Sequence, residues 1–90
     1  MSEPDDGEEA FAQETLIQAI ENQLEADDPP AAKATLNKLT LVGYERDEIL
    51  HLMALVLAAE IAAMLREDRP FDRDGYEAAL RQLPGLPEAP

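Results

Sequence analysis

The stretch ILHLMALVLAAEIAAML, residues 49–65, decides the fold of this chain, because only His51 and Glu60 among its 17 residues are polar. A helix that is apolar on nearly every side is the central element of a bundle, an oligomer interface or a membrane span. The stretch lies at the lower edge of the length that spans a bilayer, contains a glutamate and has acidic flanks. We therefore expect a central helix over 46–68 in a protein that does not enter a membrane.

Three points along the sequence separate this helix from its neighbours. The pair Pro29-Pro30 ends one amphipathic segment and begins another, since proline has no N–H to donate and fits the first turn of a helix. Gly43 is a typical left-handed C-terminal cap, and Asp72 is a typical N-cap. The helices expected from this pattern are 8–27, 30–42, 46–68 and 73–83.

The sequence thus predicts an all-α fold, a single four-helix bundle-like domain over 8–84 with a long apolar third helix. No segment alternates as a strand does, and 90 residues suffice for one core. Residues 1–7 are expected to form a disordered acidic tail, and residues 85–90 an extended proline-rich tail. The first residues lack the basic and apolar parts of a targeting segment, so we expect a cytoplasmic location.

Charge and composition exclude several classes of function. Twenty acidic residues against seven basic ones give a net charge of -13, and residues 1–28 hold ten acids and no Lys or Arg. Such a surface repels nucleic acid and anionic lipid, so neither is an expected partner. The absence of cysteine excludes disulfides, thiolate metal sites and thiol nucleophiles. With one histidine and no P-loop or dinucleotide motif, we expect no metal and no cofactor.

The two polar residues of the central stretch lie on opposite faces of the expected helix. Nine residues at about 100° each place His51 and Glu60 about 180° apart, so they cannot share a metal ion or a proton within one chain. Glu60 shares its face with core residues around Met53, and a buried carboxylate needs a partner. The groups available to pair with it are Arg46, Arg69, Arg73 and a tyrosine hydroxyl. A role in ligand binding or catalysis is the alternative to this structural one.

The face opposite Glu60 carries His51, Leu55 and alanines at positions 54, 58, 59 and 62. Small side chains let another helix approach closely, so this face needs a cover of its own. The cover that we expect first is the helix over 8–27 or 73–83 of the same chain, and the alternative is a copy of the third helix in a homodimer. Tyr44 and Tyr76 are expected to pack with their hydroxyls at the surface.

The helix boundaries and the apolar spacing follow a recognisable order. It is carried by Asp28-Pro29-Pro30, Leu36, Leu39, Gly43, His51, Glu60, Arg69-Pro70-Phe71-Asp72, Tyr76, Leu80, Leu83 and Pro84. This order, over residues 15–86, resembles small uncharacterised bacterial proteins that are grouped as a domain of unknown function. The resemblance implies a bacterial, cytoplasmic, helical protein, and it brings no activity and no site residue with it.

The function that we expect is protein interaction or self-association through the third helix, without enzymatic activity. Its apolar surface exceeds what three short amphipathic helices can cover. One alternative is an acidic mimic that binds a basic protein surface. Another is a small ligand-binding protein or enzyme with a cleft around Glu60, to which His51, Arg46 and Tyr44 would contribute.

Overall fold

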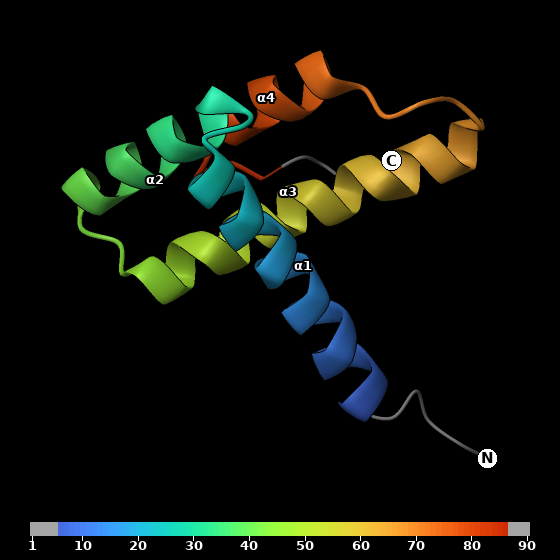
Figure 1. The fold of residues 1–90 in the computed structure, drawn as a ribbon, viewed down its shortest axis with the longest axis horizontal. Coiled ribbons are helices and arrows are strands. Elements are labelled where there is room, and N and C mark those ends of the chain that lie inside the picture. Colours follow the sequence, from blue (N-terminus) through green and yellow to red (C-terminus); the bar gives the residue numbers. More distant parts are fainter. Residues whose placement is uncertain (1–5, 87–90) are drawn as a thin grey trace.

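The computed structural model describes residues 6–86, with side chains from residue 12 onward. This described part contains four helices and no strand: α1 (Asp6–Ala26), α2 (Pro30–Val42), α3 (Arg46–Glu67) and α4 (Arg73–Gln82) (Figure 1). The predicted all-α fold with a long third helix is confirmed. Each helix begins and ends within two residues of its expected position.

The beginning of the chain differs from the prediction. Residues 1–7 are predicted to form a disordered tail, but α1 already begins at Asp6, so residues 6 and 7 belong to the helix. The acidic residues that follow favour a helix at this point, because negative charge stabilises a helix N-terminus. The rest of that predicted tail, residues 1–5, lies outside the described residues, as do residues 87–90 of the predicted C-terminal tail.

Local sequence explains where the central helices begin and end. Pro30 occupies the first turn of α2, and Gly43 follows its last turn at a φ of 118°, a left-handed conformation that glycine adopts without strain. The Gly43 N–H donates to the Leu39 carbonyl at 3.1 Å. At the start of α3, the Glu45 N–H donates to Oε1 of Glu48 at 3.0 Å. These contacts satisfy backbone groups that the helix ends leave without a partner.

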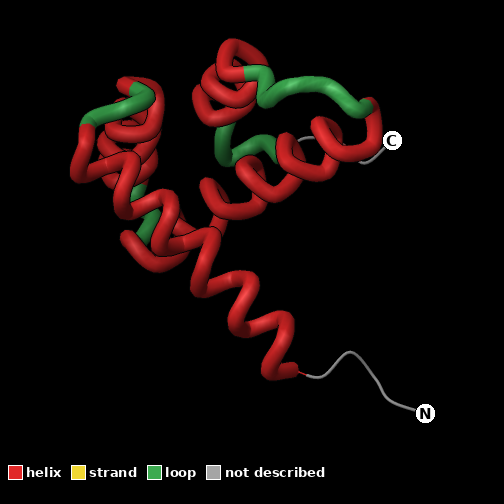
Figure 2. Tube along the Cα trace, turned by 45° about the vertical axis from the view of Figure 1, so that its right-hand side comes forward, coloured by secondary structure: helices red, strands yellow, loops and turns green. Residues whose placement is uncertain are grey.

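The other three helices pack against α3. α1 crosses α3, whereas α2 and α4 pack against each other and against α3 (Figure 1). The N-terminal half of α1 extends beyond the bundle in both views (Figure 2). Because α1 crosses α3 rather than running along it, α1 covers only a segment of the longer helix.

The core lies where the four helices meet. Its buried apolar residues are Ile20, Ala31, Ala32, Leu39, Ile49, Leu50, Met53, Ala54, Val56, Leu57, Tyr76, Leu80 and Leu83. Among the described residues, one polar side chain, that of Thr35, is buried with them. Its hydroxyl donates to the Leu80 carbonyl at 3.1 Å, so this hydrogen bond joins α2 to α4 inside the core.

Tyr76 of α4 departs from the prediction, since its hydroxyl is not at the surface. The residue is 2% exposed, and its ring packs edge-on against Phe71 with the ring centroids 5.4 Å apart. The hydroxyl donates to the Gln23 side chain of α1 at 2.8 Å. Burial raises the pKa of Tyr76 to about 12, because the ionised form would lose its hydration, and the bond to Gln23 partly opposes this effect. Tyr76 is therefore a core residue that links α4 to α1.

Candidate functional site

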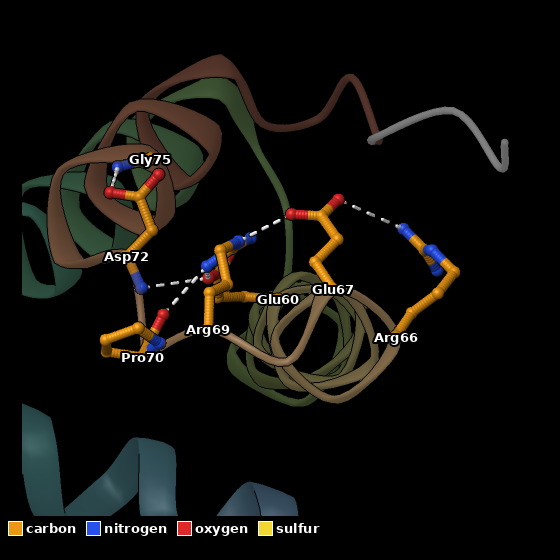
Figure 3. A network of polar contacts seen from close by, with 7 residues as sticks. All are labelled: Glu60, Arg66, Glu67, Arg69, Pro70, Asp72 and Gly75. Atoms are coloured by element: carbon orange, nitrogen blue, oxygen red, sulfur yellow. Dashed lines mark hydrogen bonds and ion pairs between the residues drawn. The ribbon is translucent and has the colours of Figure 1, made fainter.

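Glu60 lies where α3 faces the loop that leads to α4, and groups of that loop bind its carboxylate (Figure 3). Oε2 accepts a hydrogen bond from Nη1 of Arg69 at 2.9 Å and another from the backbone N–H of Asp72 at 3.0 Å. The Glu60 side chain is 12% exposed. The prediction that this carboxylate needs a partner is confirmed, and Arg69 is the predicted group that it uses.

Arg69 extends this network along the loop. Its Nε donates to Oε1 of Glu67 at 2.6 Å, and its Nη1 donates also to the Pro70 carbonyl at 2.9 Å. The hydrogen bond to Glu60, and after it the bond to Glu67, raise the pKa of Arg69. The bond between Arg69 and Glu67 in turn lowers the pKa of Glu67 below its usual 4.5. Both groups of the Arg69–Glu67 pair therefore carry their charge near neutral pH.

Asp72 connects the network to the first turn of α4. While its N–H binds Glu60, its Oδ1 accepts the Gly75 N–H at 3.0 Å, which confirms the predicted N-cap. A Cβ on residue 75 would lie 2.6 Å from Oδ2 of Asp72, so a side chain at this position would require the Asp72 carboxylate to shift. A carboxylate of α3 thus fixes the course of the loop and the start of α4, which is a structural task.

Tyr44 and His51 line a different feature, a shallow open depression at the beginning of α3. Its volume is about 430 Å³, and Asp47, Glu48 and Leu52 line it as well. Among residues 12–86, whose side chains the structure describes, no group of three or more metal-ligating side chains is arranged to hold a metal ion. An open depression of this form offers contacts to a partner but does not enclose a small molecule.

Arg46 lies apart from both of these features. It lines a groove of about 390 Å³ between α1 and α2, together with Glu21, Glu25 and Lys33. Arg46 precedes Glu60 by fourteen residues, which is about 21 Å of helix. The structure therefore brings Tyr44 and His51 together, but it does not join either of them, or Arg46, to Glu60.

One side of α3 is open to solvent along about four turns. His51, Leu55, Ala59, Ala62 and Leu65 follow one another at three- and four-residue spacings, and all five are exposed. The exposed fraction is 40% for Leu55 and 72% for Leu65. We call these five residues the α3 flank. They form a continuous row that is apolar except for the histidine at its N-terminal end.

The prediction that α1 or α4 covers this face of α3 is wrong for the α3 flank. Ala54 is buried and Ala58 is half-buried, but the flank residues beside them stay exposed. The arrangement of the helices gives the reason, because α1 crosses α3 at one place and α4 packs beside α2 (Figure 1). Neither helix runs along α3 for the length of the flank.

By length and composition alone, α3 also qualifies as a membrane span, and it is the one helix within residues 6–86 that does. In its most apolar window of 18 residues, 33% of the residues are buried inside the structure. The core helix of a soluble protein passes the same test, so this property is weak support for a membrane segment.

Thr35, which is not a predicted site residue, and Arg73, which is a predicted partner of Glu60 but binds other carboxylates, also hold the helices together. Thr35 lies four residues before Leu39 and therefore on the same buried face of α2. The helical spacing in the sequence could have predicted its burial. Arg73 binds Asp28 in the α1–α2 connection and also Glu77 one turn later in α4. Because Arg73 and Asp28 are 45 positions apart, no local sequence pattern predicts that they pair.

No protein-family model matches the chain, and no curated protein or solved structure shows significant similarity to it. The resemblance to a bacterial group of unknown function therefore stays a prediction. The function has to be inferred from the residues of this chain and from the surfaces that its fold exposes.

Proposed function

We propose that this protein is an interaction module and that the α3 flank is its binding surface. The supporting observation is the continuous exposure of the five flank residues, among them Leu55 and Leu65, along one side of one helix. Single exposed apolar residues are ordinary on soluble proteins, whereas a continuous row is typical of a surface that a partner covers. Fourteen residues separate the first flank residue from the last, so the row is about 21 Å long.

The residues of the row suit a helical partner. Alanines at positions 59 and 62 let the backbone of another helix approach closely, while Leu55 and Leu65 supply apolar area. Docked helices are recognised through anchors at this three- and four-residue spacing. The kind of partner that fits the α3 flank is therefore another amphipathic helix.

Binding to a basic protein surface is a second candidate, and the charge of α1 supports it. Glu14, Glu21 and Glu25 are exposed, and residues 12–28 hold no Lys or Arg to neutralise them. An electrostatic complex of this kind weakens steeply with ionic strength, whereas apolar docking hardly changes. Repeating any binding measurement at about 0.05 M and about 0.5 M NaCl therefore separates the two candidates.

Ligand binding or catalysis at Glu60 has less support. The Oε2 atom of its carboxylate already holds Arg69 and the backbone of Asp72, and the side chain is largely covered. A ligand at Oε2 would have to replace the contacts that fix the start of α4.

Site-specific photo-crosslinking tests the α3 flank directly. A benzophenone-bearing amino acid at Ala62 is expected to form discrete covalent adducts in cells that express the chain, because a partner covers that position. The same amino acid at Ala78, an exposed alanine of α4, is the matched control. Adducts at Ala62 that equal those at Ala78, or that persist in an Ala59→Arg variant, would contradict the proposal.

A further inference from the structure

We propose that the partner which covers the α3 flank is the same flank of a second copy of this chain, with the two α3 helices antiparallel. This inference rests on the proposed function of the flank, and it names the occupant. It comes from the order of residues between Glu48 and Arg66, because that order is complementary to itself when the helix is reversed.

Glu48 and Arg66 lie at the two ends of the flank and on the same side of it. Eighteen residues separate them, which is about five full turns at 3.6 residues per turn, so both side chains leave the helix in the same direction. Both residues are exposed. A two-fold axis at the height of residue 57 would exchange the helix ends and bring Glu48 of each copy beside Arg66 of the other.

Both charged groups have capacity for such a pair. Glu48 uses Oε1 for the Glu45 N–H, which leaves Oε2 for another donor. Arg66 makes a long ion pair of 3.9 Å with Glu67, and Arg69 holds Glu67 more closely, at 2.6 Å. A parallel pair of helices would instead bring Glu48 to the same height as Glu48, and Arg66 to the same height as Arg66, without any Glu48–Arg66 pair. Because like charges repel, the antiparallel arrangement is the favoured one.

In the inner part of the flank, large and small residues face each other under the same two-fold axis. Position 55 faces position 59, so Leu55 of each copy packs on Ala59 of the other. His51 faces positions 62 and 63, which are both alanine. A large side chain against a small one allows close packing of two helices, whereas leucine against leucine would hold them apart.

No residue from 12 to 86, the range whose side chains the structure describes, covers this row. The large apolar residues at the remaining positions are Met1 and Phe11. A net charge of -13 on each copy opposes association in general. Attraction between two copies is therefore favoured where Arg66 can meet an acidic residue, and the antiparallel pair provides two such contacts.

The molar mass of the purified protein over a dilution series tests the pairing. One helix face makes a small interface, and small interfaces bind weakly, so light scattering should run from on the order of 1 mM down to about 1 µM protein. We expect the mass to fall on dilution from twice 9.9 kDa towards 9.9 kDa.

Charge reversal tests the antiparallel register. Arg66→Glu and Glu48→Lys each bring like charges together and should each raise the dissociation constant of the dimer about tenfold. The double variant Glu48→Lys/Arg66→Glu restores both ion pairs and should restore the affinity. Arg81→Glu reverses an exposed charge on α4 and is the matched control.

Circular dichroism shows whether each variant is folded. Glu48→Lys also loses the hydrogen bond to the Glu45 N–H, and the double variant shares this loss. Recovery of the dimer in the double variant therefore cannot come from a repaired fold.

A chain that is monomeric at every concentration overturns the pairing. A dimer that is insensitive to Arg66→Glu, or a double variant as weak as the single ones, overturns the antiparallel register. If the chain is monomeric but the Ala62 probe forms a specific adduct with a different protein, the α3 flank is still a binding surface. In that case only the proposal that a second copy occupies it is overturned. The absence of any specific Ala62 adduct overturns the proposed function as well.

Discussion

At the scale of single residues, Glu60 shows how a carboxylate is accommodated in an apolar helix. Burying its ionised carboxylate among core residues costs free energy, because the charge loses hydration. The hydrogen bonds from Arg69 and from the Asp72 N–H offset this cost. The sequence places Glu60 on the core face and offers arginines for it. It does not show which arginine is close, because that depends on the course of the loop after α3.

Replacing Glu60 is therefore expected to reduce stability. Glu60→Gln keeps an acceptor but removes the charge, so the free energy of unfolding should fall by about 1 kcal/mol. Glu60→Leu leaves the Asp72 N–H without its partner and should cost about 2–3 kcal/mol. Urea denaturation followed by circular dichroism measures both. Glu67→Gln, at an exposed position on the same arginine, is the control and should change less; a Glu60→Leu chain as stable as the wild type would refute this account of the network.

Tyr76 should give the fold an alkaline limit. Its pKa is raised from 10.0 to about 12, so the folded state keeps the phenol neutral where the unfolded state ionises it. The corresponding stabilisation is complete below pH 10 and is lost as the pH rises towards 12. In a Tyr44→Phe variant, absorbance of the remaining tyrosinate should have its midpoint near 12. In Tyr76→Phe, the loss of stability between pH 10 and 12 should be smaller than in the wild type, and an equal loss would assign it to other groups.

At the scale of elements, α3 combines a buried face with an exposed one of nearly the same character. The sequence predicts the helices and their approximate ends, since Gly43 after α2 and Asp72 before α4 act on their immediate neighbours. It predicts that the face around Met53 is covered, but it does not predict that the opposite face stays open. That depends on the angle at which α1 crosses α3, and apolar residues on both faces satisfy either choice.

The contact between α2 and α4 depends on the hydroxyl of Thr35. Thr35→Val keeps the shape of the side chain but removes the donor to the Leu80 carbonyl, so unfolding should become easier by about 1 kcal/mol. Thr40→Val is the matched control, because the Thr40 hydroxyl is exposed and bonds to Leu36 of its own helix. In thermal and urea unfolding, Thr35→Val should be less stable than Thr40→Val. Equal stabilities of the two variants would show that the buried hydrogen bond contributes nothing.

At the scale of the whole molecule, the net charge follows directly from the sequence. The arrangement of the charged groups in space does not. The imbalance of -13 and its concentration in the first third of the chain are plain from composition. The few ion pairs that reach between elements, such as Arg73 with Asp28, join distant positions. They follow from the packing of the helices and not from any local pattern.

Salt should accordingly stabilise this protein. Repulsion among its acidic residues is long-ranged, whereas its ion pairs are short, so raising NaCl from about 10 mM to about 500 mM screens mainly the repulsion. The melting temperature should rise by about 5 °C, which corresponds to roughly 1 kcal/mol in a domain of this size. Scanning calorimetry at both concentrations provides the test. A melting temperature that falls with added salt would mean that local ion pairs outweigh the net charge.

The extension of α1 beyond the bundle has a kinetic consequence. Positions 12–15 are all exposed, whereas Ile20 is fully buried, so one helix passes from solvent into the core within two turns. Backbone amides in the outer turns can exchange their hydrogens through fraying of the helix end, without unfolding of the rest. Amides around Ile20 exchange only when α1 leaves α3. Protection against exchange should therefore rise steeply along this single helix, so that α1 opens progressively from its free end.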